Sequence, residues 1–79
     1  PNPANEKVTI QLSLDKSYEV NLSVFDLMGR KLTDLSHNEM LTTGTHIFNW
    51  NTTDVEPGIY FYRLNIGNNS IARKIIVTR

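Results

Sequence analysis

Apolar and polar residues alternate with a period of two along most of this 79-residue chain, and this alternation constrains the fold more than any other feature. A β-strand turns successive side chains to opposite faces, so the pattern predicts strands with one face in a core and the other in solvent. No stretch has the periodicity of an amphipathic helix. The clearest alternating runs span residues 8–14, 18–24, 46–50, 59–66 and 71–78.

Short turn signals separate these runs. Asp15-Lys16-Ser17 is a polar turn, and we expect the two strands that flank it to pair with each other. Asp26-Leu27-Met28-Gly29 has aspartate first and glycine fourth, which a type I turn favours, and the change of parity at Phe25 predicts a bulge. Pro57-Gly58 fits the two central positions of a type II turn. Gly67-Asn68-Asn69 is expected to close a hairpin between the last two strands.

The middle of the chain is less regular. Residues 30–35 predict a short strand with charged side chains, but residues 36–43 have no period. We expect a loop there, or a strand crossing between two sheets, with Met40 and Leu41 tucked beneath it. The whole pattern gives six to seven short strands, which is typical of an all-β antiparallel sandwich in one small domain.

Composition excludes several classes of function. Eight basic residues balance eight acidic ones, so nothing indicates the basic surface with which proteins bind nucleic acids. The absence of cysteine removes disulfides, thiolate catalysis and zinc–thiolate sites. No apolar run approaches the roughly 20 residues of a membrane span, and we expect no signal peptide within these residues. A chain of this size has no room for a deep cleft, so we expect no small-molecule substrate.

Residues 1–7 are predicted to be a linker. Each proline of Pro1-Asn2-Pro3 restricts the residue before it to extended conformations, as in segments that join domains. Since the chain does not begin with methionine, we expect it to be a piece of a longer protein. An upstream cargo domain would then precede the linker, and the folded domain would span residues 8–79.

The sequence offers no convincing catalytic site. Hydrolysis needs a nucleophile, a base and a group that orients the base, all within hydrogen-bond reach. His37 follows Ser36 in the irregular segment, but neighbours in sequence do not make a dyad. His46 is in phase with Phe48 and Trp50, which indicates a partly buried packing residue. We therefore expect that the chain is not an enzyme.

Two kinds of ligand site have a competing structural explanation. The oxygens of Asn51, Thr53, Asp54 and Glu56 could hold calcium, but their spacing matches no calcium loop and such residues are ordinary turn formers. A sugar platform could use the rings of Trp50, Tyr60, Phe61 and Tyr62. Only Phe61 lies on the phase opposite to the expected core, and one ring is not a platform. We expect neither a metal nor a cofactor.

Arg73-Lys74 precedes the apolar residues Ile75-Ile76-Val77 near the end of the chain. Charges beside an apolar run lower the risk of aggregation on an edge strand, which is a structural reason for their presence. Alternatively, the last strand is read by a partner that contacts Lys74, Thr78 and Arg79. Periodicity alone favours the structural reason.

Five short motifs follow one another along nearly the whole chain. They are Pro1-Asn2-Pro3, Val24-Phe25-Asp26-Leu27-Met28-Gly29-Arg30, Gly44-Thr45-His46 with Trp50, Gly58-Ile59-Tyr60 with Arg63-Leu64, and Lys74 with Ile75-Ile76-Val77. Each motif is weak alone, but five in this order are fairly specific. With them the chain resembles the type A C-terminal sorting domains of the type IX (Por) secretion system of Bacteroidetes.

The resemblance implies an immunoglobulin-like sandwich and a function without catalysis. Domains of this kind follow a secreted cargo, which reaches the periplasm by its own signal peptide. The outer-membrane secretion machinery then recognises the folded domain, a sortase-like peptidase often removes it, and the cargo is anchored at the surface or released. The recognition residues expected here are Lys74, Ile75, Ile76, Val77, Thr78 and Arg79.

We expect the last strand, from Ile71 to Arg79, to lie at a sheet edge and to end in free chain, where strand addition is possible. The motif residues Asp26, Gly29, Gly58 and Tyr60 are expected to be structural. Two other classes stay open. An ancillary carbohydrate-binding module of a secreted enzyme predicts a row of exposed aromatic rings, and a structural spacer similar to fibronectin-like domains predicts an interior position in the parent protein.

Overall fold

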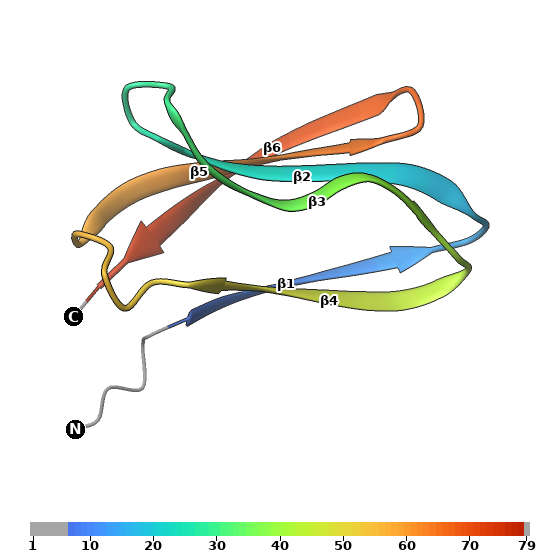
Figure 1. The fold of residues 1–79 in the computed structure, drawn as a ribbon, viewed down its shortest axis with the longest axis horizontal. Helices are drawn as coiled ribbons and strands as arrows, with labels where there is room; N and C mark the ends of the chain where they lie inside the picture. Colours follow the sequence, from blue (N-terminus) through green and yellow to red (C-terminus); the bar gives the residue numbers. More distant parts are fainter. Residues whose placement is uncertain (1–6, 79) are drawn as a thin grey trace.

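A computed structural model describes residues 7–78, which form six antiparallel strands in two facing sheets (Figure 1). The strands are β1 (Lys7–Leu14), β2 (Tyr18–Asp26), β3 (Lys31–Leu41), β4 (Gly44–Asn51), β5 (Gly58–Ile66) and β6 (Asn69–Val77). β1 pairs with β4 in one sheet, and the other sheet has the order β3-β2-β5-β6. The predicted all-β sandwich is confirmed. Arg79 and most of the proposed linker lie outside the described residues, and Lys7 begins β1.

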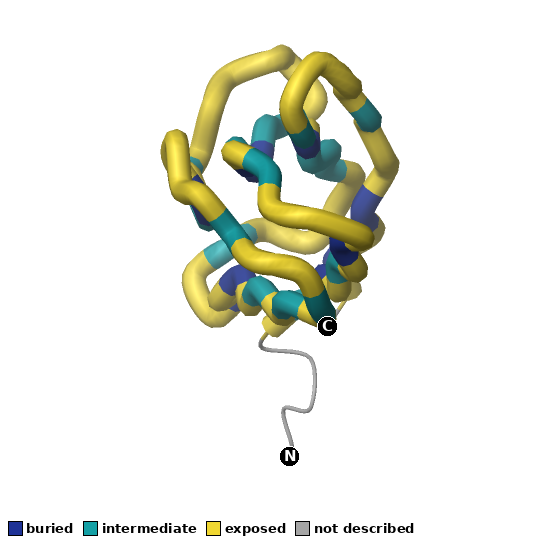
Figure 2. Tube along the Cα trace, turned by 90° about the vertical axis from the view of Figure 1, so that its right-hand side faces the viewer, coloured by how far each residue is buried: buried dark blue, intermediate teal, exposed yellow. Residues whose placement is uncertain are grey.

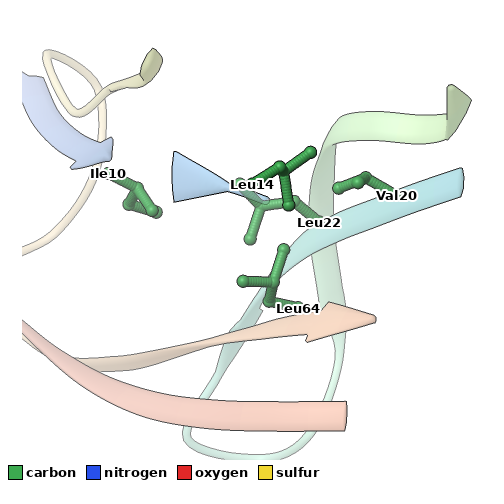
Figure 3. Close-up of a cluster of buried hydrophobic side chains, with 5 residues drawn as sticks. All are labelled: Ile10, Leu14, Val20, Leu22 and Leu64. Carbon is green, nitrogen blue, oxygen red and sulfur yellow. The ribbon is translucent and has the colours of Figure 1, made fainter. Parts of the chain in front are cut away.

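One core lies between the two sheets. Val20, Leu22 and Val24 of β2 are fully buried, so the alternation predicted for this strand is confirmed. Figure 3 shows Ile10 and Leu14 of β1 meeting Val20, Leu22 and Leu64 from the larger sheet. Each such side chain contributes roughly 1.5–3 kcal/mol through burial. In Figure 2 the connections between strands are mostly exposed, and the buried residues lie mainly within the strands.

β1 and β2 do not pair, so the hairpin expected from their short connection is wrong. β1 lies opposite β4 instead, with Val8 opposite Trp50 and Ile10 opposite Phe48. β2 pairs with β3 along one edge and with β5 along the other. Because a strand has only two edges, β2 has none left for β1. Asp15-Lys16-Ser17 therefore carries the chain from one sheet to the other.

β3 is a continuous 11-residue strand within one sheet, where the sequence predicts a short strand followed by a loop or a crossing. Its pairing with β2 shifts register three times, each time with an extra residue on β3. One shift lies opposite Val24 and Phe25, so the bulge at this place is on β3, while β2 itself runs through Phe25 in regular register with β5. Each extra residue reverses the alternation, so the strand has no visible period. Leu41 packs against the core as expected, but Met40 is 68% exposed rather than tucked away.

The turns predicted at Asp26-Leu27-Met28-Gly29 and at Gly67-Asn68-Asn69 are confirmed. The Gly29 N–H donates to the Asp26 carbonyl at 3.0 Å, which is the first-to-fourth hydrogen bond of a β-turn. Between β5 and β6, Ile66 lies opposite Asn69, so Gly67 and Asn68 form a two-residue hairpin loop. Gly67 has a φ of 56°, which glycine adopts without strain.

The type II turn predicted at Pro57-Gly58 is wrong. Gly58 has a φ of 154°, whereas the third residue of a type II turn needs about +80°. Gly58 is instead the first residue of β5 and lies opposite Val77. The hydrogen-bonded turn of this connection comes earlier, where the Val55 N–H donates to the Thr52 carbonyl at 3.1 Å.

Candidate functional site at the β6 edge

β6 is an edge strand of the four-stranded sheet, as expected (Figure 1). It pairs with β5 through nine consecutive residue pairs, from Gly58–Val77 to Ile66–Asn69, without a register shift. No other strand among residues 7–78 pairs with its second edge. One row of its backbone N–H and C=O groups is therefore free of strand partners there.

The predicted recognition residues alternate between the core and solvent. Ile75 and Val77 are buried and belong to the same apolar cluster as Trp50. A partner of the folded domain cannot reach these two side chains, which instead anchor β6 to the core. The exposed positions are Lys74, Ile76 and Thr78.

The opposite edge of the same sheet is protected. β3 has three register shifts in its pairing with β2, and Asn38 takes a left-handed conformation with a φ of 51°. Charged side chains also line it, including Lys31, Asp34 and Glu39. Bulges and charges are the usual means by which proteins prevent unwanted strand pairing. The two edges of the larger sheet therefore differ, and β6 is the regular one.

Arg73 is the one charge of β6 whose phase points inward. It shares the phase of buried Ile75, yet it is exposed, and its guanidinium donates to the Ala72 carbonyl at 3.2 Å. An inward-pointing charge discourages the pairing of two identical edges. This arrangement fits the protective role considered for Arg73, while Lys74 points to the outer face of the sheet.

Asp26 organises the turn between β2 and β3. Its Oδ1 accepts hydrogen bonds from the backbone N–H groups of Met28 and Arg30, both at 2.9 Å, and its Oδ2 lies 2.9 Å from Arg30 Nε. The Arg30 N–H, and next the Arg30 guanidinium, hold the pKa of Asp26 below its ordinary value. Gly29 has a φ of 86°, which side chains other than glycine adopt with strain. These contacts fit the structural role expected for both residues.

Tyr60 connects the other motifs. Its ring meets Trp50 edge to face with centroids 5.4 Å apart, and its hydroxyl donates to the Glu56 carbonyl at 2.6 Å. The Gly-x-Tyr motif at the start of β5 is thereby joined to the tryptophan at the end of β4. Such packing fits the structural role expected for Gly58 and Tyr60.

The residues considered for catalysis form hydrogen bonds with other groups and not with one another. Ser36 Oγ is buried and lies 2.7 Å from Glu39 Oε1 and 3.1 Å from the Val20 carbonyl. The His37 ring contacts the Asn38 amide. His46 is half-buried, as expected, with Nε2 at 2.7 Å from the Thr42 carbonyl.

The side chains considered for calcium and for sugars have structural contacts or do not lie together on the surface. Asn51 Oδ1 accepts a hydrogen bond from the Thr53 N–H at 2.9 Å, as in a turn. Within residues 7–78 no three histidine, aspartate or glutamate side chains gather in a way that could hold a metal. Trp50 is buried and Phe61 half-buried beside Phe25, so the four rings considered for sugars do not line up on the surface.

Phe25 and Ile59 were not considered for binding from the sequence. On the outer face of the larger sheet, Phe25 lies opposite Phe61 and Ile59 lies opposite Ile76. The sequence shows the phase of these residues, but it does not show which face of the larger sheet stays uncovered.

The described part of the chain contains no helix long and apolar enough to cross a membrane.

The two antiparallel sheets place the domain among small immunoglobulin-like β-sandwiches. Residues 1–78 match the family described as the secretion system C-terminal sorting domain, and the chain belongs to this family of type IX sorting signals. Comparisons with curated proteins and with solved structures gave no match. The family is one of sorting signals rather than enzymes. A domain of this family is attached to a cargo protein, interacts with the secretion machinery and is exported with its cargo.

Proposed function

We propose that β6 is the element by which the type IX machinery at the outer membrane recognises the folded domain, and that recognition proceeds by strand addition. The observation that carries this proposal is the open, regular edge of β6, set against the bulged edge of β3. A strand of the partner that pairs with β6 gains backbone hydrogen bonds worth roughly 0.5–1.5 kcal/mol each.

Alternate side chains along β6 have two different roles in binding. Lys74 and Ile76 on β6, and Thr78 directly after it, are exposed and supply the specificity, while the buried Ile75 and Val77 hold the strand against the core. At alternate positions along this edge, a partner strand therefore contacts a positive charge, then an apolar side chain, then a hydroxyl.

The remaining steps are those that the family resemblance implies. The cargo crosses the inner membrane with its own signal peptide, and the domain folds in the periplasm before the outer-membrane step. A sortase-like peptidase then removes the domain from the cargo, which is anchored at the cell surface or released. None of these steps needs chemistry from the domain itself.

An export assay tests the role of β6. A signal peptide and a fluorescent reporter are placed before residues 1–79 and expressed in a bacterium with a type IX system. The first variant lacks residues 78–79, which follow β6 and leave the core intact, and the second is Lys74→Glu. Lys7→Glu is the matched control, because Lys7 is an exposed lysine on the other sheet.

We expect both β6 variants to lower extracellular fluorescence by about fivefold or more, which corresponds to a loss of about 1 kcal/mol or more of recognition free energy. Lys7→Glu should leave export within about twofold of the unmodified fusion. If both β6 variants are exported as well as Lys7→Glu, while each purified domain unfolds at the unmodified temperature, the proposal fails.

A further inference from the structure

An apolar strip crosses the outer face of the four-stranded sheet, on the side away from β1 and β4. It consists of Ile59 and Ile76, which lie opposite each other on β5 and β6, and of Phe25 and Phe61, which lie opposite each other on β2 and β5. Ile59 is 42% exposed and Ile76 is 61% exposed. We call these four residues the outer strip. Contiguous apolar surface of this kind marks interaction sites more often than isolated exposed residues do.

A hollow of about 400 Å³ opens beside the two phenylalanines. The turn between β2 and β3 supplies one wall, because the hydrogen bonds of Asp26 fold it over the end of the sheet. The hollow is large enough for one apolar side chain of a partner. Its lining includes Phe25, Leu27, Gly29, Phe61, Arg63 and Ala72.

Two cations, Arg63 and Lys74, lie beside the outer strip, and neither forms an ion pair within residues 7–78. Among residues 7–78 the two ion pairs join Asp26 to Arg30 and Asp34 to Lys31, so neither includes Arg63 or Lys74. The Arg63 guanidinium carbon lies 5.5 Å from the centre of the Phe25 ring, at the rim of the hollow. The surface therefore offers an apolar hollow with cations beside it.

We propose that the outer strip and its hollow form a second contact surface for the same partner that adds a strand to β6. The occupant is an extended protein segment with an apolar side chain for the hollow and a neighbouring carboxylate for Arg63. This inference rests on the proposed function. It gives the Asp-x-x-Gly-Arg turn a binding role in addition to its structural one.

Continuity with the β6 edge supports the choice of this partner. Lys74 and Ile76 belong both to the proposed recognition strand and to the outer face. A strand added to β6 lies about 4.8 Å from it and continues the same sheet. Its outward side chains therefore come level with Ile76, and the chain that follows can cross the strip toward the hollow. One partner then contacts both the edge of β6 and the outer face of the larger sheet.

The export assay separates this surface from the edge. Ile59→Glu places a charge in the strip, and Arg63→Glu reverses the cation at the rim of the hollow. Ile47→Glu is the matched control, since Ile47 is 59% exposed on the outer face of the other sheet. Ile59→Thr is a milder second variant that keeps the β-branch, and thermal unfolding of each purified chain confirms folding.

We expect Ile59→Glu and Arg63→Glu to lower export by about fivefold or more, and Ile47→Glu to stay within about twofold of the unmodified fusion. If the strip variants, including Ile59→Thr, are exported as well as Ile47→Glu while the β6 variants fail, the strip is not a contact surface and the edge alone is read. If the unmodified fusion is not exported, the proposed function itself fails.

Two other occupants are tested with the purified chain. Co-flotation with phosphatidylglycerol vesicles that Ile59→Glu abolishes would show that the strip binds lipid, and would overturn the proposal. A concentration-dependent dimer in sedimentation velocity that Ile59→Glu abolishes would overturn it too, because a second copy would then cover the strip. A monomer that does not float, combined with the export defect, supports a protein partner.

Discussion

Trp50 and Tyr60 meet edge to face, with ring centroids 5.4 Å apart and ring planes at 70°, and this contact joins the two sheets of the sandwich. Trp50 ends the buried part of β4 in the smaller sheet, and Tyr60 lies near the start of β5 in the larger one. The same apolar cluster contains Ile75 and Val77 of β6. The contact therefore supports the strand for which we propose a recognition role.

Removing the Tyr60 hydroxyl tests this support. Tyr60→Phe loses the hydrogen bond to the Glu56 carbonyl and should lower the free energy of unfolding by about 1 kcal/mol, measured by urea denaturation. Tyr62→Phe is the control, because the Tyr62 hydroxyl makes no hydrogen bond within residues 7–78, and it should cost less. Equal losses from both variants would mean that the Glu56 bond does not stabilise the domain.

The turn glycine gives a second test. Gly29→Val should lower the free energy of unfolding by about 1 kcal/mol or more, because a β-branched residue is strained at a φ of 86°. Nothing lies within 4 Å of the added Cβ, so the cost is one of backbone conformation and not of a clash. Gly29→Asn should cost less, since asparagine tolerates left-handed conformations. An unchanged melting temperature for Gly29→Val would contradict this account.

The depressed pKa of Asp26 predicts a loss of stability in acid. Its carboxylate is favoured in the folded state, so its contribution is fully present above the ordinary pKa of 3.8 and is lost as the pH falls through the lower, folded value. Asp26→Asn should destabilise the domain at pH 7 and flatten the fall in melting temperature below about pH 4. The amide oxygen can still accept the two backbone hydrogen bonds, so the turn itself should persist.

Asp34 behaves in the same direction, since the Ser23 hydroxyl, followed by Lys31, lowers its pKa. The double variant Asp26→Asn/Asp34→Asn should therefore have a flatter acid profile than either single variant. A double variant that loses stability below pH 4 as steeply as the unmodified chain would exclude these two carboxylates as the source of the acid sensitivity.

Arg73 offers a test of edge protection. Arg73→Val gives β6 an uninterrupted apolar inner row with Ile71 and Ile75, and should increase concentration-dependent aggregation, measured by light scattering. Ala72→Val is the control, because it adds an apolar side chain to the outer phase of the same strand. Aggregation that rises equally in both variants would indicate general hydrophobicity and not the inward charge.

Strand existence and phase were predictable from the sequence, because they depend on local alternation. Val20, Leu22 and Val24 are buried and Lys74 and Ile76 are exposed, as the period of two indicates. The continuity of β3 was not predictable, since its bulges reverse the alternation that would have revealed it. The one sign of these bulges in the sequence was the parity change at Phe25, on the partner strand β2.

Strand pairing was harder to predict from the sequence, because it depends on partners that are far apart along the chain. The short connection after Leu14 favours a hairpin, yet the edges of β2 are taken by β3 and β5. The outer strip escaped prediction for a related reason. The phase of Ile59 and Phe61 shows that they leave the core, but only the sheet order brings them beside Phe25 and Ile76.

Amide hydrogen exchange in a complex tests the central claim most directly. The purified chain is mixed with the purified outer-membrane complex of a type IX system, and exchange is measured residue by residue in the free and bound states. Alternate backbone N–H groups of an edge strand point away from its neighbour. Strand addition therefore predicts that every second amide between Asn69 and Val77 slows by about tenfold or more, while the amides of β3 do not change. Binding that leaves the β6 amides exchanging at their free rates would contradict the account.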